Sequence, residues 1–308
     1  MIASGDIKIL SVIAEYKFLT TEQISILCQR SIPVIRRRLR DLSKKCLISI
    51  QERVFGKGVG RKEYVIIISE EGLLMLKSKG ILSLHANYIT DKTSSLNFIE
   101  HDLLVNWFLI HLTQIERSNN RFQVFILTTS SHNLTQGDFN RPLTMERFSN
   151  DDKSGKINTM IPDGVFTITD KKAKKALLFF LEVDMGTETL ASPTLSPGDI
   201  KQKINNYQSL FKYGTYDRYS NIVNNKFNGF RLLFLTDTVN RKESICHLVQ
   251  SMPPSDFIWV TNQQQVTING AAAEIWARGG HYNKKPESIL SKKLSFKIPA
   301  PKNNRNLS

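Results

Sequence analysis

The sequence predicts an α+β or α/β protein, with a small basic helical module followed by a mixed sheet flanked by helices. Residues 1–85 show helical apolar periodicity followed by one hairpin pattern. Residues 90–280 give the order helix, three strands, helix, strand, helix, strand. We therefore expect one domain at 1–85, a second at 90–280, and a basic C-terminal tail at 281–308.

Charge is segregated along the 308-residue chain, whose formal net charge is +14. Residues 1–85 carry +7, residues 86–280 carry +1, and residues 281–308 carry +6. Basic segments on either side of a nearly neutral body suit contact with a polyanion, although a basic tail can also serve solubility alone.

No segment approaches the roughly 18–20 apolar residues of a spanning helix, and the N-terminus does not have the pattern of a secretion signal. The three cysteines are widely spaced, with no paired or zinc-like arrangement. We expect no membrane partner, no structural zinc, and a cytoplasmic location.

The first eighty-five residues predict three helices. An apolar face runs from Ile7 to Tyr16, and Thr20 with Gln23 forms a capping box for a helix that ends near Leu27. Ser31 is a candidate N-cap for the third helix, and Pro33 lies in its first turn. The third helix buries one side and presents guanidinium groups on the other faces.

A strand from Leu47 to Arg53, a glycine-rich basic loop over 56–62 and a returning strand over 63–68 follow the third helix. This order resembles the winged helix-turn-helix family. The resemblance implies that the third helix enters the major groove of double-stranded DNA and that the loop, the wing, approaches its backbone. The predicted DNA contacts are Arg36, Arg37, Arg40, Lys44, Lys57, Arg61 and Lys62. Alternatively, such a domain serves only dimerisation or protein docking.

In the body, strands are expected over 122–127, 161–168, 176–185, 230–236 and 257–260, with helices over 96–112, 199–212 and 240–250. Residues 131–160 are polar and are expected to form an insertion loop. Pro162 and Asp163 stand at the head of one strand, and Glu182 and Asp184 at the end of the next. A hairpin would place Asp163 beside Glu182, and two carboxylates are ligands suited to Mg²⁺.

This order of elements resembles the PD-(D/E)xK nuclease superfamily. The resemblance implies that Asp163 and Glu182 hold a metal and that a lysine two residues after the glutamate activates water. Asp184 occupies that lysine position, and Lys201 or Lys203 on the following helix could compensate. The candidate catalytic residues are therefore Asp163, Glu182, Asp184 and Lys203, with Asp163 and Glu182 as the candidate metal ligands.

More closely, the chain resembles the replication-relaxation family of plasmids and other mobile elements from about residue 5 to 280. The matching segments are His101 to Asn106, Pro162-Asp163, Phe180 to Glu188, and Lys203 to Tyr207. The resemblance implies a DNA-binding protein of a mobile element that acts in replication, relaxation, transfer or transcription control, with replication or transfer proteins as partners.

Three functional hypotheses follow, with different requirements. In the first, a non-enzymatic protein binds duplex DNA without a cofactor and uses a nuclease-like body for oligomeric or partner contacts. In the second, a Mg²⁺-dependent endonuclease or nickase uses Asp163 and Glu182. A protein-docking adaptor without DNA affinity is a third reading, and a homodimer is expected separately because winged-helix regulators often bind two half-sites.

Overall fold

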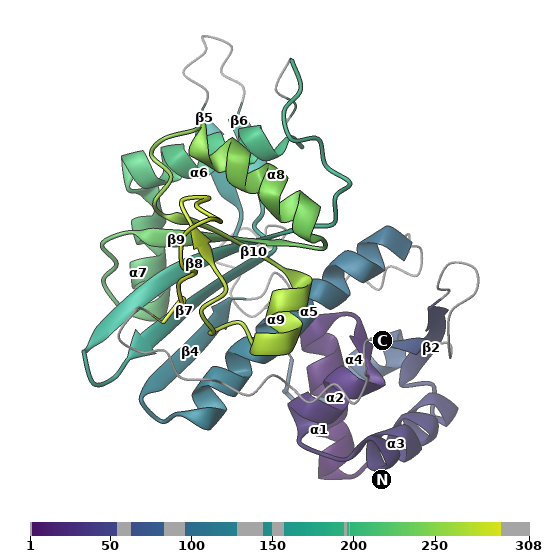
Figure 1. Ribbon diagram of the computed structural model, residues 1–308. Helices are drawn as coiled ribbons and strands as arrows, with labels where there is room; N and C mark the ends of the chain where they lie inside the picture. Colours follow the sequence, from purple (N-terminus) through teal and green to yellow (C-terminus); the bar gives the residue numbers. More distant parts are fainter. Residues whose placement is uncertain are drawn as a thin grey trace. The chain divides into compact units, whose positions relative to one another are not determined.

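The computed structural model describes residues 2–53, 63–82, 96–127, 144–149, 157–193, 196 and 198–290 (Figure 1). They form two compact units, one containing the described residues up to Ile110 and the other those from His111 onward. Helices and strands occur in both, so the chain is a mixed α+β protein, as predicted. In the described residues, no helix is long and apolar enough to cross a membrane.

The first unit contains a three-stranded antiparallel sheet in the order β1-β3-β2. The predicted capping box is present, since the Thr20 backbone N–H donates to Gln23 Oε1 at 2.9 Å and the Gln23 N–H donates to Thr20 Oγ1 at 3.3 Å. Ser31 is the N-cap of the third helix, but its side chain makes no capping hydrogen bond. The elements are α1 (Ser4–Tyr16), β1 (Leu19–Thr20), α2 (Thr21–Cys28), α3 (Ile32–Lys44), β2 (Ile48–Arg53), β3 (Glu63–Ile68) and α4 (Glu70–Ser78).

The long helix α5 (Leu96–Ser118) contributes residues to both units. Its first part is tied to the first unit by buried polar side chains. Asn106 Nδ2 donates to the carbonyls of Tyr16 at 3.0 Å and Phe18 at 2.6 Å, and Gln23 Nε2 donates to the Leu103 carbonyl at 3.1 Å. These bonds satisfy backbone oxygens that would otherwise be costly to bury.

The second unit is built on a six-stranded sheet in the order β11-β10-β9-β8-β7-β4. Strands β8, β9 and β10 are parallel, and the other neighbouring pairs are antiparallel. The strands are β4 (Phe122–Leu127), β7 (Gly164–Asp170), β8 (Lys175–Asp184), β9 (Phe230–Thr236), β10 (Ile258–Asn262) and β11 (Ala277–Arg278). The helices are α6 (Ile200–Tyr213), α7 (Arg218–Val223), α8 (Val239–Gln250) and α9 (Gln263–Asn269).

The expectation that residues 131–160 form only a loop is wrong where the structure describes them. Strands β5 (Glu146–Ser149) and β6 (Ile157–Met160) pair there as a two-stranded sheet. Their polar sequence is compatible with burial because the Glu146 carboxylate accepts hydrogen bonds from Arg218 and Tyr219. A buried carboxylate satisfied in this way does not oppose strand formation.

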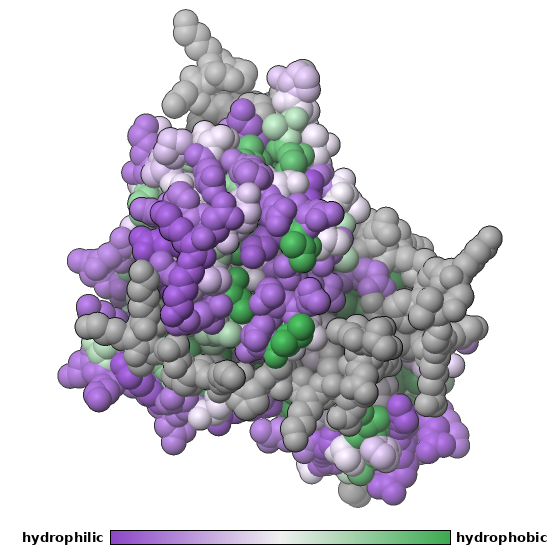
Figure 2. Space-filling model, viewed as in Figure 1, coloured by the Kyte–Doolittle hydropathy of each residue, from purple (hydrophilic) through white to green (hydrophobic). Residues whose placement is uncertain are grey.

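Apolar side chains gather mainly inside each unit. Phe166 and Phe179 stack on neighbouring strands with ring centroids 4.8 Å apart, and both are fully buried. On the face shown in Figure 2, hydrophilic residues cover most of the described surface and hydrophobic ones form small separate patches. The last seven residues of β8, from Leu178 to Asp184, are all buried, so acidic side chains at its end lie in a largely apolar setting.

Candidate functional site

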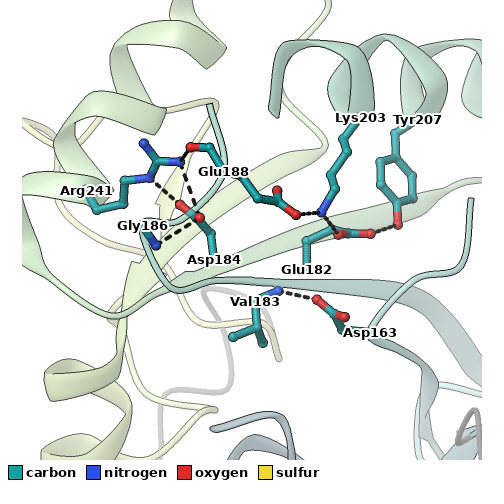
Figure 3. A network of polar contacts seen from close by, with 9 residues as sticks. All are labelled: Asp163, Glu182, Val183, Asp184, Gly186, Glu188, Lys203, Tyr207 and Arg241. Carbon is teal, nitrogen blue, oxygen red and sulfur yellow. Dashed lines mark hydrogen bonds and ion pairs between the residues drawn. The ribbon is translucent and has the colours of Figure 1, made fainter. Parts of the chain in front are cut away.

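The pairing of β7 with β8 brings two acidic side chains to one end of the sheet. Gly164 lies opposite Leu181, so Asp163 reaches the end of β8, where its Oδ2 accepts a hydrogen bond from the Val183 N–H at 2.7 Å. Glu182 precedes Val183 on that strand (Figure 3). The backbone register therefore brings together the two carboxylates that the sequence predicted to be neighbours.

Glu182 is deeply buried, with a residue exposure of 2%. Its Oε1 accepts from the Tyr207 hydroxyl at 2.5 Å and its Oε2 from Lys203 Nζ at 3.1 Å. Burial raises the pKa of Glu182 to about 7, the Lys203 ammonium opposes that rise, and the charge of Asp163 adds to it.

Lys203 comes from α6 and brings a positive charge to the acidic strand end. Besides Glu182, its Nζ contacts Glu188 Oε1 at 2.7 Å, and only 18% of the side chain is exposed. Burial lowers its pKa, but the attraction of Glu182, Glu188 and Asp163 outweighs burial and raises the pKa overall. The amine is therefore held as an ammonium between carboxylates.

The loop before α6 fixes the start of this helix. Asp199, the N-cap residue, is buried and accepts hydrogen bonds from the backbone N–H groups of Ser192 and Ser196, both at 2.9 Å, and from the Ser192 hydroxyl. The N–H groups of Ile200 and Lys201 donate to loop carbonyls at 3.0 and 2.9 Å. Lys203 thus projects from a helix whose first turn is well anchored.

Asp184 lies in the same network but has a different partner. It is buried and forms an ion pair with Arg241 of α8, and its Oδ1 accepts from the Gly186 N–H at 3.1 Å. The same guanidinium donates to the Glu188 carbonyl at 2.5 Å. The extra carboxylate at the expected lysine position is therefore neutralised by an arginine.

Arg241 was not predicted from the sequence. It lies on α8, 57 residues after Asp184, and α6, α7 and β9 come between them in the sequence. No local spacing therefore connects the two positions. Glu188 and Tyr207 were identified from the sequence only as the ends of two segments that resemble the replication-relaxation family. Their contacts link them to Glu182 directly and through Lys203 (Figure 3).

Carboxylate oxygens are the ligand type that Mg²⁺ prefers, so Asp163 and Glu182 fit that ion in chemistry. No group of three or more metal-ligating side chains occurs within the described ranges, so these two side chains would hold it. Mg²⁺ is often held by one or two carboxylates, with waters and substrate phosphates as its other ligands. Glu188 Oε2 lies on the same network. It is buried and has no hydrogen-bond partner among the described residues.

The second candidate surface is the exposed side of α3. Ile35, Leu39 and Leu42 are buried and fix which face points inward. The basic side chains at Arg36, Arg37, Arg40 and Lys44 are exposed and make no ion pair with a described acidic side chain. The predicted contacts Lys57, Arg61 and Lys62 lie outside the described residues.

Arg38 on the same helix has a different environment. Its guanidinium forms an ion pair with the buried Asp6 of α1 and a second with Asp41 at 3.1 Å. The hydrogen bonds from Arg38 hold the pKa of Asp6 below its usual range despite the opposing effect of burial. Arg38 therefore joins two helices, whereas its basic neighbours face solvent.

These features define an α+β protein with a basic helix in one unit and an acidic strand end, neutralised by lysine and arginine, in the other. The family model described as replication-relaxation matches residues 10–225. The chain therefore belongs to the replication-relaxation family, which indicates a role in replication or relaxation of mobile elements. No curated protein matches the sequence.

Proposed function

We propose that this chain is a DNA-binding protein of a plasmid or other mobile element, which acts in replication, relaxation, transfer or transcription control. The observation that carries the proposal is the solvent-facing basic side of α3. Arginines there can contact phosphates and guanine edges, and they do not have to give up an existing ion pair to a described residue.

The arrangement of the first unit supports a winged helix-turn-helix. Three helices precede a pair of antiparallel strands, and the connection between β2 and β3 is the segment predicted to form the basic wing. A recognition helix needs one face for packing and another for the groove. The buried residues of α3 provide the first face and its arginines provide the second.

The test is a fluorescence anisotropy titration of a labelled duplex at several salt concentrations. A triple alanine variant at Arg36, Arg37 and Arg40 should bind duplex more weakly than wild type. Its slope of log affinity against log salt should be shallower by about 3. The side chains are exposed, so the variant should fold normally.

A matched control removes three exposed or half-buried lysines elsewhere in the same unit, at Lys8, Lys77 and Lys79. This control changes the net charge equally and should retain most of the affinity. Unchanged binding by the α3 variant, or equal loss in both variants, would contradict the assignment to α3.

The alternative function is a metal-dependent DNA endonuclease or nickase, and one contact favours it. The Lys203 ammonium lies 3.1 Å from Glu182, although the sequence position expected to supply it is aspartate. An ammonium beside the two carboxylates could orient an attacking water or stabilise charge on a phosphate. Mg²⁺, when held by Asp163 and Glu182, would supply Lewis-acid activation of the phosphodiester.

In this alternative, the surrounding residues keep the ammonium in place. The Tyr207 hydroxyl donates to Glu182 and orients that carboxylate, while Glu188 accepts from Lys203 on another side. Because the pKa of Lys203 is raised, this residue is suited to electrostatic stabilisation and not to accepting a proton.

Incubation of supercoiled and linear DNA with Mg²⁺ or Mn²⁺ tests the alternative. Wild type should nick or cut, whereas Asp163→Ala and Lys203→Gln should lose at least about a hundredfold in rate. Lys201→Gln, on the same helix but outside the network, is the control and should stay active. Metal-dependent cutting that persists in Asp163→Ala, or no cutting by wild type, would count against a nuclease.

A further inference from the structure

A pocket of about 710 Å³ lies at the end of the large sheet where β8 and β9 begin. Glu182 lies near the other end of β8. The pocket is lined by the first residues of β8 and β9, by the start of β10, and by the last part of α6. Its volume is in the range of small-molecule sites, roughly 300–1,000 Å³. Neither the carboxylate network nor α3 contributes to it.

The lining is strongly cationic, with five lysine or arginine side chains against one aspartate, Asp256. Lys174, Lys175 and Lys226 are exposed and pair with no described carboxylate. Arg278 reaches Asp256 and Glu287 only at 3.8 and 3.9 Å. This concentration of positive charge would attract an anion.

Arg231 places a further positive charge in the wall of the pocket. Its guanidinium lies 4.4 Å from the Trp259 ring centroid and donates to the Ile289 carbonyl at 2.7 Å. Burial, and then the nearby charge of Arg278, lower its pKa to about 10. A bound anion would offset the repulsion between the two guanidinium groups.

The pocket also offers an aromatic surface. Phe211 stacks on Phe257 with ring centroids 4.8 Å apart and remains 37% exposed. Exposed aromatic rings beside cationic side chains are the combination that binds single-stranded nucleic acid, because bases stack on the rings while lysines neutralise phosphates. In a duplex, neighbouring base pairs cover the faces of the bases.

From this combination we infer that the pocket binds a nucleotide unit, that is, a phosphate together with its unpaired base. The ligand is either a free nucleotide or one unit within single-stranded DNA, which share this chemistry. The inference goes beyond duplex binding by α3 and does not depend on it.

The experiment measures anisotropy of a labelled oligothymidylate and calorimetric binding of free dTMP to the full chain. Lys175→Gln combined with Lys226→Gln should weaken oligonucleotide binding and reduce its salt slope by about 1.4, because single strands contribute about 0.7 per phosphate contact. Phe211→Leu should weaken it at least about fivefold through loss of base stacking. Because both lysines are exposed, the double variant decides the matter even if Phe211→Leu does not fold.

The matched control is Lys242→Gln with Lys285→Gln, two lysines of the same unit that do not line the pocket. Affinity that falls in the pocket variant but not in the control supports the inference. Binding of dTMP as tight as that of the oligonucleotide identifies a free nucleotide, whereas tighter binding of the oligonucleotide identifies single-stranded DNA. Three results would overturn the inference: the pocket variant binds the oligonucleotide as tightly as wild type does, wild type binds neither ligand, or polyglutamate displaces the oligonucleotide as well as unlabelled oligonucleotide does.

Failure of this inference is distinguishable from failure of the proposed duplex binding. The α3 triple variant should bind the oligonucleotide as wild type does, and the pocket variant should bind duplex as wild type does. Each pair of results therefore bears on one site alone.

Discussion

The Glu182 carboxylate shares one ammonium group with two other carboxylates. Asp163 and Glu188 both act on Lys203, and all of these charges lie close to a buried strand end. Burial is the main effect that disfavours ionisation of Glu182, the charge of Asp163 adds to it, and the Lys203 ammonium opposes it. Glu182 therefore takes up a proton more readily than an exposed glutamate.

This raised pKa makes stability depend on pH. Between the ordinary value of 4.5 and the folded value of about 7, the folded state binds more protons at Glu182 than the unfolded state does. The contribution of Glu182 to the free energy of unfolding is therefore present at low pH and lost as pH rises through 7. Glu182→Gln should gain stability relative to wild type between pH 5 and pH 8, by at most about 3 kcal/mol.

Urea unfolding at a series of pH values measures this difference. Glu243→Gln, an exposed position on α8, is the control and should show no such trend. A difference between Glu182→Gln and wild type that stays constant across the range would show that Glu182 titrates normally.

At this scale, the sequence predicted what strand register determines and missed what depends on three-dimensional packing. Asp163 and Glu182 were expected to be neighbours because a hairpin sets their register. Lys203 was named as a compensating residue from its helical position. The Arg241 partner of Asp184 depends on how α8 packs on β9 and β10, which local spacing does not encode.

The arginines of helix α3 differ in their surroundings. Arg38 contacts Asp6, which is 1% exposed, whereas its neighbours face solvent. Arg38→Gln leaves that carboxylate without its main partner, so we expect a loss of roughly 1–3 kcal/mol in unfolding free energy. Arg37→Gln should change stability by no more than about 0.5 kcal/mol.

Denaturant unfolding of the two variants checks this contrast, and duplex binding provides the second measurement. At temperatures where both are folded, Arg37→Gln should bind duplex more weakly and Arg38→Gln should be nearly unaffected. The reverse pattern would mean that Arg38, and not its neighbours, faces the ligand.

Among the elements, long periodic segments were predicted well. The strands Phe122–Leu127 and Phe230–Thr236 have the predicted bounds. Helix α8 begins one residue before its predicted start, α6 is shifted by one residue at both ends, and α5 extends six residues beyond its predicted end. Short elements were missed: β1 and β11 have two residues each, too few to show a period. Strands β5 and β6 were also missed; the buried Glu146 of β5 pairs with Arg218, 72 residues later, which the local sequence does not show.

For the whole molecule, the proposed duplex site and the proposed nucleotide pocket belong to different units. The two sites share no residue. We therefore expect them to act independently, with saturating duplex changing oligonucleotide affinity by less than about threefold. Competition anisotropy with each ligand labelled in turn measures this, and full displacement of one ligand by the other would indicate a single shared site.

The attachment of Lys203 to α6 also affects how the site could be adjusted. A lysine on β8 would be held at a separation from Glu182 set by the strand's own repeat. Here the amine and the carboxylate belong to different elements, joined through the segment organised by Asp199. Substitutions in that segment can move the ammonium without altering the sheet, so charge placement and sheet stability can evolve independently.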